Sequence, residues 1–421
     1  MIFCNLTKFH NYYDWEQRKL SSLLTISSKK NNGYYKIRDI LAASLGTELQ
    51  KKYVYFGLKA TDDSIKNYKV VLKNDVIYTK SPIKGFPNGI IRTNKGENGI
   101  VPTLYCVYHC KENVNASIIQ SYFDDKNRLD KYLFPLVNVG ARNNVNITDK
   151  EFLKGTIIIP VNFKEQNQII KILEKLDNLI TLHQRKCDQL KKLKKTMLKK
   201  MFPCDGSSIP EIRFTGFTDD WEQRKLGEVL ISLQNNTLSR VNLMSETGVA
   251  KNVHYGDVLI KFGDILDVSK EKLPMISDES ILKKYKASFL QDGDVIVADT
   301  AEDSSVGKCS EITGLNDEIV LSGLHTIPYR PVEKFASGYL GYYLNSSAYH
   351  NQLIPLMQGI KVMSISKSAM QNTDIIYPKL EEEQTKIGQY FSQLDNLITL
   401  HQRELEILKN LKKTCLKRMF I

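Results

Sequence analysis

Two peptides occur twice in this chain, both times in the same order. DWEQRKL stands at residues 14–20 and again 206 positions later at 220–226, and LDNLITLHQR stands at 176–185 and again 218 positions later at 394–403. The segment between the two anchors is therefore 12 residues longer in the second half, and the two segments barely resemble each other. This pattern is typical of a tandem duplication in which two halves share one frame and hold different inserts.

The second anchor belongs to a heptad pattern that both halves contain. Apolar residues recur at alternating steps of four and three from Ile169 to Met201, and the same positions displaced by 218 run from Ile387 to Met419. Such spacing predicts a coiled-coil seam. Each helix is expected after a proline that ends an apolar run, and the first is expected from about residue 166 to 202. A single core helix is the alternative, but helices of this length exceed the usual three to four turns.

The duplication also predicts how the two helices pair. Two equivalent helices on one chain pack most simply about a pseudo-two-fold axis, which makes them antiparallel, sets Ile169 beside Met419 and places the inserts at opposite ends. The predicted fold class is α+β, with two globular α/β domains separated by two long antiparallel helices that form a coiled coil. The predicted segments are 1–163 and 221–380 for the globular domains, 164–202 and 381–421 for the helices, and 203–220 for a connector with several Gly and Pro residues.

The inserts contain short apolar runs separated by turn residues. These runs predict strands at residues 70–78, 104–108 and 156–159 in the first insert, and at 258–262, 294–298, 319–321 and 374–377 in the second. A helical patch is expected at 335–344. Because long amphipathic helices do not alternate with the strands, the inserts are expected to be α+β domains and not βαβ repeats.

The chain carries an excess of positive charge. Its 59 Lys and Arg residues against 47 Asp and Glu residues give a net charge of +12. A polyanionic partner is the simplest explanation, although many soluble proteins are basic without one. No apolar stretch approaches the roughly 18 residues of a membrane span, and the start of the chain lacks a secretory signal. With seven scattered cysteines, a cytoplasmic protein is expected.

Polar loops with glycines occur at matched places in both inserts. Arg, Lys, Asn and Gln side chains pair with base edges, and Ser, Thr and Lys suit phosphates. One pair of loops follows the strands at 70–78 and 294–298, and the other lies near the ends of the inserts. The residues predicted to contact DNA are Lys80, Lys84, Arg92, Arg142, Asn143 and Asn144 in the first insert, and Thr300, Ser304, Ser305, Lys308 and Lys361 in the second.

Catalytic signatures are missing from the sequence. Residues 305–309 are the nearest approach to a P-loop but lack its first glycine and closing hydroxyl, and the motifs of adenine methyltransferases, serine hydrolases and HExxH metalloproteases do not occur. Cys106, His109 and Cys110 crowd together, but zinc normally needs four ligands and no second pair stands at metal spacing. His183 and His401 occupy seam positions and are expected to be structural. We therefore predict neither catalytic residues nor a metal site.

The repeated motifs resemble those of the specificity subunit of type I restriction-modification systems, over essentially the whole chain. The resemblance is carried by DWEQRKL, which occurs twice, by PEIRFTGFTDDWEQRKLGEV at 210–229, by LSGLHTIPYRP at 321–331 and by EEEQTKIGQYFSQLDNLITLHQRE at 381–404. The first half departs from the pattern because it lacks the PEIRF lead-in. The resemblance implies two target-recognition domains, each reading one half of a split DNA sequence, held apart by the long helices.

The resemblance also implies partners and cofactors. The implied partners are double-stranded DNA, methyltransferase (modification) subunits that bind S-adenosylmethionine, and a restriction/translocase subunit that uses ATP and Mg. The chain itself is then expected to bind no cofactor, to be non-catalytic and to have no membrane partner. Two alternatives stay open: a self-contained restriction endonuclease with a cryptic metal-dependent site at Asp299, Glu302 and Lys308, and a coiled-coil adaptor without a nucleic-acid role.

The two long helices differ in charge. Residues 164–202 carry eleven Lys and Arg against four acidic residues, whereas residues 382–420 carry seven against five. We expect Lys191, Lys192, Lys195 and Lys199 to lie near DNA or an acidic partner surface. A solvated basic face is the alternative interpretation.

Overall fold

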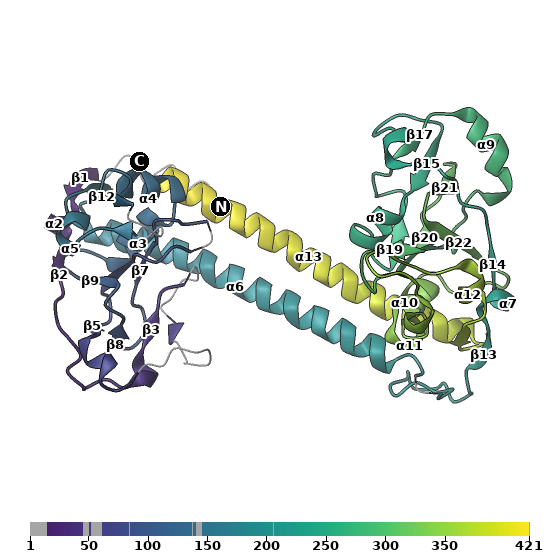
Figure 1. Cartoon of the computed structure of the whole chain (residues 1–421), viewed down its shortest axis with the longest axis horizontal. Coiled ribbons are helices and arrows are strands. Elements are labelled where there is room, and N and C mark those ends of the chain that lie inside the picture. The colour runs from purple at the N-terminus through teal and green to yellow at the C-terminus, as the bar shows by residue number, and fades with distance from the viewer. Residues whose placement is uncertain are drawn as a thin grey trace. The chain divides into compact units, whose positions relative to one another are not determined.

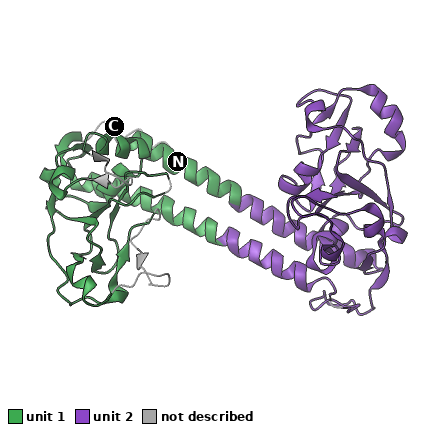
Figure 2. Cartoon of the chain, viewed as in Figure 1, with its two compact units in different colours: residues 1–185, 402–421 green, residues 186–401 purple. Residues whose placement is uncertain are grey.

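The structure is a computed structural model that describes residues 15–44, 50–51, 61–83, 85–136, 138–139, 145–204 and 206–420. The chain forms two compact units, one of residues 1–185 with 402–421 and the other of residues 186–401 (Figure 2). Both long helices, α6 (Phe163–Lys200) and α13 (Glu381–Met419), contribute residues to each unit. Among the described residues, no helix is both long enough and apolar enough to cross a membrane.

The first unit is built on a four-stranded antiparallel sheet in the order β2-β9-β6-β7. Strands β2, β9 and β7 of this sheet are labelled in Figure 1. Phe152 packs beneath this sheet, where its ring stacks on Tyr78 and Tyr108 with centroids 4.8 and 5.1 Å apart. The elements before α6 are β1 (Trp15–Lys19), α2 (Leu20–Leu23), β2 (Leu24–Ile26), η2 (Ile37–Asp39), β3 (Leu41–Ala42), β4 (Gln50–Lys51), η3 (Ser64–Asn67), β5 (Lys69–Val71), β6 (Val76–Thr79), β7 (Ile90–Thr93), β8 (Gly99–Val101), β9 (Tyr105–Cys110), α3 (Ala116–Phe123), α4 (Lys126–Leu133), β10 (Asn138–Val139), β11 (Val145–Asn146), α5 (Asp149–Phe152) and β12 (Thr156–Pro160).

The second unit is built on a five-stranded mixed sheet in the order β14-β22-β18-β20-β16. An aromatic cluster fills its core, and within it Phe202 stacks on Phe391 with centroids 5.9 Å apart. The elements before α13 are β13 (Glu222–Lys225), α7 (Leu226–Val229), β14 (Leu230–Ser232), η5 (Arg240–Asn242), β15 (Ala250–Val253), α8 (Tyr255–Ile260), β16 (Ile265–Asp267), β17 (Met275–Ile276), α9 (Glu279–Tyr285), η6 (Lys286–Ser288), β18 (Val295–Ala298), β19 (Thr300–Ala301), β20 (Cys309–Thr313), β21 (Val320–Ser322), β22 (Thr326–Pro331), α10 (Tyr339–Asn345), α11 (Ser347–His350), η7 (Ile354–Leu356), β23 (Met363–Ser364), α12 (Lys367–Gln371) and β24 (Asp374–Tyr377).

In each half, the repeated DWEQRKL peptide forms a strand that pairs with the last strand of the insert. In the first half it forms β1, which pairs antiparallel with β12 so that Trp15 lies opposite Pro160. In the second half it forms β13, which pairs antiparallel with β24 so that Glu222 lies opposite Tyr377. The start and the end of each insert therefore meet directly before a long helix begins.

The tryptophan of each anchor is bonded to the first turn of its helix. The indole Nε1 of Trp15 donates to Glu165 at 3.2 Å, and that of Trp221 donates to Glu383 at 3.3 Å. Both glutamates are almost fully buried. Since Glu165 and Glu383 are 218 positions apart, the duplicated frame includes this contact as well as the sequence motif.

The next helix residue ties each insert to the helix start. The side-chain amide of Gln166 accepts the Asn115 N–H at 2.9 Å, and that of Gln384 accepts the Ala336 N–H at 2.9 Å. Each amide also donates at 2.8 Å to the carbonyl of the proline that precedes its helix. Equal contacts in the two halves therefore hold two different inserts against equivalent helix turns.

The two long helices run antiparallel within each unit. Lys412 donates to Asp177 at 2.5 Å in the first unit, and Lys194 donates to Asp395 at 2.5 and 2.7 Å in the second. These are the same two helix positions, because each lysine and each aspartate has its equivalent 218 residues away.

Seam packing agrees with this antiparallel register. Ile169 and Met419 belong to one buried cluster in the first unit, and Met201 and Ile387 belong to another in the second. The antiparallel pairing expected from the duplication is confirmed. The first helix was expected from about residue 166 to 202, and it begins and ends slightly earlier, at Phe163 and Lys200.

Three predicted elements differ from the observed ones. Residues 258–262 were predicted as a strand, but this segment lies in and just after helix α8, which His254 caps by accepting the Gly256 N–H. Val258 and Phe262, four residues apart, are both buried, so the apolar run has helical spacing. The strand predicted at 70–78 is two strands, β5 and β6, separated by a turn with Asn74 at φ 68°. The helical patch predicted at 335–344 is shorter and begins only at Tyr339.

Candidate nucleic-acid interface

The structure brings together the two polar loops that were predicted separately in the second insert. Strand β19 at the start of the 300–308 loop pairs with β23, so that Thr300 lies opposite Ser364 and Ala301 opposite Met363. The N–H of Ile365 also donates to the carbonyl of Asp299 at 2.9 Å. The segment that contains Lys361 is therefore anchored directly to the loop that contains Thr300.

The hydroxyl-bearing residues of the 300–308 loop are partly or fully exposed. Thr300 donates through Oγ1 to Asp299 at 2.7 Å, and the N–H of Ser305 donates to Asp303 at 2.9 Å. The Ser305 hydroxyl and N–H hold the pKa of Asp303 below its usual value. Ser304 and Lys361 are exposed. These side chains can reach a phosphate or a base edge at the surface.

Lys308 has a different position from the one that the sequence suggested. Its Nζ donates to the backbone carbonyls of Leu259 and Phe262 at 2.7 and 3.1 Å, where helix α8 ends. Burial lowers the pKa of this lysine. A cation at a helix C-terminus stabilises the orphan carbonyls there. Lys308 thus has a structural role, and we leave it out of the candidate interface.

Arg92 in the first insert is likewise held inside the domain. Its side chain is 7% exposed and pairs with Asp124 at 2.8 Å, and its Nε donates to the Ser44 carbonyl at 2.8 Å. Contact with DNA would require breaking this ion pair, so we leave Arg92 out as well. Lys80 is partly exposed at the end of β6. The other predicted positions, Lys84 and residues 142–144, lie outside the described residues.

A cleft in the second insert contains candidates that the sequence did not single out. It has a volume of about 510 Å³ and is lined by Gln234 and Asn235 after β14, by Lys284 and Lys367, and by Asp299. The amide of Asn235 donates to the Gly323 carbonyl at 3.1 Å, which orients the side chain. Amide side chains beside lysines suit base edges and phosphates. The run of three amides that starts at Gln234, directly after a strand, was the signal available in the sequence.

A basic cleft of about 610 Å³ occurs in the first unit. Three of its lining residues, Lys409, Lys412 and Lys413, come from α13, and Lys126 comes from the insert. Asp124 and Asp125 also line it, so the charge is mixed but net positive. The three helix lysines stand 218 residues after Lys191, Lys194 and Lys195 of α6.

The residues of the alternative nuclease site do not form a metal site. Lys308 points to backbone carbonyls, and the carboxylate of Asp299 accepts from Thr300. Within the described part of the second insert, no three His, Cys, Asp or Glu side chains gather at metal-binding distance. The arrangement therefore gives no support to metal-dependent cleavage at this loop.

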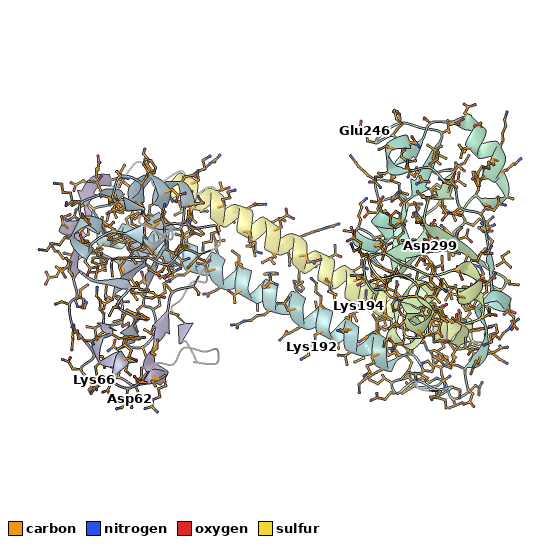
Figure 3. All side chains as sticks on the ribbon, viewed as in Figure 1. Asp62, Lys66, Lys192, Lys194, Glu246 and Asp299 are labelled. Carbon is orange, nitrogen blue, oxygen red and sulfur yellow. The ribbon has the colours of Figure 1, made fainter. Side chains whose placement is uncertain are left out.

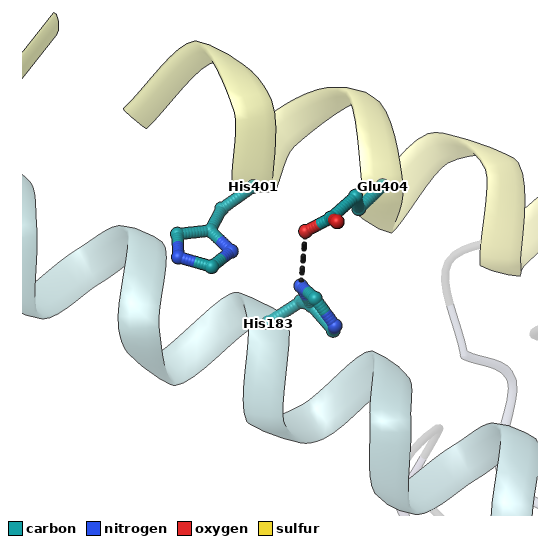
Figure 4. A group of neighbouring side chains, drawn as sticks. All are labelled: His183, His401 and Glu404. Atoms are coloured by element: carbon teal, nitrogen blue, oxygen red, sulfur yellow. Dashed lines mark ion pairs between the residues drawn. The ribbon is translucent and has the colours of Figure 1, made fainter. Parts of the chain in front are cut away.

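Two histidines noted in the sequence contact acidic side chains, and burial affects two of the cysteines. His183 Nδ1 lies 3.0 Å from a carboxylate oxygen of Glu404, in the part of the two helices that belongs to the first unit (Figure 4). His109 on β9 contacts Asp75 at 2.6 Å. Burial raises the pKa of Cys106 and of Cys110 to about 12, so both thiols stay protonated at neutral pH.

Comparison with known proteins identifies one family along most of the chain. The sequence profile of the Type I restriction modification DNA specificity domain matches twice, at residues 12–192 and 218–410. The Type I restriction enzyme MjaVIII specificity subunit of Methanocaldococcus jannaschii is 26% identical over 419 residues, covering 95% of this chain and 90% of that protein. A putative MjaX specificity subunit of the same organism is 24% identical over 436 residues, with coverage of 95% and 91%.

Solved structures share the fold. The crystal structure of the type I restriction-modification S subunit from M. genitalium aligns with a TM-score of 0.58 and 13% identity, over 99% of this chain and 98% of that one. A chain from a study of complex assembly and conformational transition in a type I R-M system aligns with a TM-score of 0.51 and 16% identity, over 97% and 98%.

Proposed function

Because the chain belongs to the family of type I restriction-modification DNA specificity subunits, we propose that each of its two inserts reads one half of a bipartite DNA target. The observation that supports this proposal most directly is the repeated frame, that is, the strand pairs and helix starts that both halves share. Two unlike inserts are closed by matching strand pairs, β1 with β12 and β13 with β24, and are tied to matching helix turns. A frame that stays constant while the inserts diverge suits two recognition domains that change independently.

We assign the surface contacts of the second insert to Thr300, Ser304, Ser305, Lys361 and the cleft with Gln234 and Asn235. Their exposure, their polar chemistry and the pairing of β19 with β23 support this assignment. In the first insert the proposed contacts are Lys80 and Lys84 together with Arg142, Asn143 and Asn144. Losing a base contact should cost about 1–3 kcal/mol at one position of the target, whereas losing a phosphate contact should weaken binding to all sequences alike.

The long helices have two proposed roles, to set the spacing of the half-sites and to dock the methyltransferase subunits. Exposed leucines support the docking role: Leu179 and Leu182 are 42% and 61% exposed, and their equivalents Leu397 and Leu400 are 44% and 50% exposed. Unpaired leucines at equivalent positions suit a partner helix that binds once per half.

Catalysis is proposed to belong to the partners and not to this chain. S-adenosylmethionine would bind to the methyltransferase subunits, and ATP and Mg to a restriction/translocase subunit. Sequence-specific recognition by this chain would then direct both activities. The endonuclease alternative lacks support from the geometry of Asp299, Glu302 and Lys308.

The proposed function is tested by mapping methylated adenines in DNA from cells that carry this chain with its methyltransferase subunits. The expected result is one split motif, with two specified half-sites and an unspecified spacer, that disappears when the gene for this chain is deleted. A continuous motif, or a methylation pattern that does not depend on this chain, would contradict the proposal. Binding of the complex to duplex DNA should also weaken steeply as salt rises.

A further inference from the structure

A tight hairpin projects from the second insert at residues 358–364. Gln358 and Ser364 exchange backbone hydrogen bonds of 2.9 and 2.8 Å, and five residues form the loop between them. Gly359 has φ +115°, and a Cβ there would lie 2.0 Å from the Val362 carbonyl oxygen, so only glycine fits. The turn of this hairpin therefore requires glycine at position 359.

The base of this hairpin is anchored in the domain. Met357 and Met363 pack against the main hydrophobic cluster of the second unit, and Met363 lies opposite Ala301 in the pairing of β23 with β19. The apolar residues at the base of the hairpin are thus covered by the protein.

The residues at the tip are not covered. Ile360 is 97% exposed and Val362 is 55% exposed, and Lys361 between them is exposed as well. Ile360 is the most exposed of the large apolar side chains among the described residues. A large apolar side chain that a hydrogen-bonded hairpin exposes to water is typical of a contact surface.

The hairpin's own segment is basic, although the loop that pairs with it carries Asp299, Glu302 and Asp303. The sequence contains no Asp or Glu between Lys334 and Thr373, although acidic residues are frequent elsewhere in the chain. Lys361 stands at the tip, and Lys367 follows at the cleft. The Ser364 end of the hairpin is paired with Thr300, one of the residues assigned above to DNA contact.

We propose that the tip of this hairpin enters a groove of the DNA, where Ile360 packs against a base pair of the second half-site and Lys361 contacts the backbone. The inference rests on the proposed function and names a residue that determines specificity. Apolar side chains contact the methyl group of thymine in the major groove and wedge between base steps in the minor groove. In both modes, the preference of Ile360 for a base pair is lost when the side chain is shortened.

The test uses the full chain assembled with its methyltransferase subunits and two duplexes, one with the mapped target and one without it. Three variants are compared: Ile360→Ala, Lys361→Ala, and Ile260→Ala as the matched control. Ile260 is 89% exposed in the same insert but stands three residues after Asp257 and four before Asp264, outside the acid-free segment. Affinity for each duplex is measured, followed by a scan of single base-pair changes across the second half-site.

Ile360→Ala is expected to weaken target binding by about tenfold, to leave non-target binding within about twofold, and to abolish discrimination at one base pair of the second half-site. Lys361→Ala should weaken binding to both duplexes alike, and Ile260→Ala should change neither. Wild-type affinity and discrimination in Ile360→Ala would overturn the inference and leave the proposed function standing. Loss of the methyltransferase subunits from this variant would also overturn it, by identifying the tip as a protein contact. Equal binding of both duplexes by the wild-type complex would instead contradict the proposed function.

Discussion

Lys194 joins both long helices to the second insert, and its removal should destabilise the second unit. Its Nζ contacts Asp395 of α13 at 2.5 Å and Asp264 of the insert at 2.6 Å. Figure 3 labels Lys194 on the part of α6 that lies beside the second insert. Tyr342 of α10 donates to the same Asp395 carboxylate at 2.9 Å. Burial alone would lower the pKa of Lys194, but the two carboxylates outweigh burial and raise it. The lysine is therefore charged at neutral pH, and Lys194→Met leaves two carboxylates facing each other.

The size of the effect follows from the exposure of the three side chains. Lys194 and Asp264 are each 15% exposed, and Asp395 is 37% exposed. Breaking a fully buried ion pair costs about 3–5 kcal/mol, and breaking an exposed one costs about 0–1 kcal/mol. We expect Lys194→Met to lower the free energy of unfolding by about 2–3 kcal/mol. For a unit of this size, that corresponds to a fall in Tm of about 5–10 °C.

The equivalent lysine in the first half provides the matched control. Lys412 contacts Asp177 at 2.5 Å, and the two side chains are 19% and 20% exposed. Because this pair involves one carboxylate, Lys412→Met should cost less, about 1–2 kcal/mol. Calorimetric unfolding of the full chain at neutral pH measures both variants. Adding Asp264→Asn to Lys194→Met should recover about 1–2 kcal/mol, because it removes one of the facing charges. A Tm within 1 °C of wild type for Lys194→Met, or no recovery in the double variant, would refute this account of the network.

Three further predictions concern titration, docking and backbone conformation. Burial raises the pKa of Glu311 to about 7 in the folded protein, above its value in the unfolded chain. The stability that Glu311 contributes is therefore present below about pH 4.5 and is lost as the pH rises towards 7. Urea unfolding should show that Glu311→Gln loses less stability than the wild type over this pH range. Leu182→Asp should reduce co-purification of the methyltransferase subunit by about tenfold at unchanged Tm, because Leu182 is 61% exposed and the substitution places a charge on an apolar docking surface. Full retention of the subunit would exclude Leu182 from the docking surface. Gly359→Ala should weaken target binding as much as Ile360→Ala does, because it distorts the hairpin backbone; wild-type affinity would show that the hairpin conformation is irrelevant to binding.

The frame of the protein could be predicted from the sequence because it is repeated. Repetition identified the anchors and predicted that the two helices pair antiparallel, with Ile169 near Met419, and the heptad spacing predicted the helices themselves. The contact from each anchor tryptophan to Glu165 or Glu383 was not predicted, since a hydrogen bond across 150 residues leaves no local pattern. The inserts were harder, because short apolar runs fit both strands and helices, as residues 258–262 illustrate.

The candidate interface could be predicted only in part, and for a physical reason. A basic or polar side chain in a loop has the same sequence signature whether it faces solvent or an internal partner. Arg92 pairs with Asp124, and Lys308 caps α8, so both are structural. Ile360, which we propose as a further contact, is apolar, and its exposure depends on the hairpin that Gly359 permits. Residues 142–144 and the predicted domain boundaries stay predictions.

The central claim is that the two inserts read their half-sites independently, and exchange of one insert tests it most directly. Residues 20–160 are replaced by the matching insert of a related specificity subunit, which supplies its own equivalent of β12, while β1 and both long helices are retained. Methylated adenines are then mapped in cells that carry the hybrid with its methyltransferase subunits. The reciprocal exchange of residues 226–378 is the control. The account predicts that each hybrid changes one half of the split motif and leaves the other half and the spacer length unchanged. A change of both half-sites by a single exchange would contradict it.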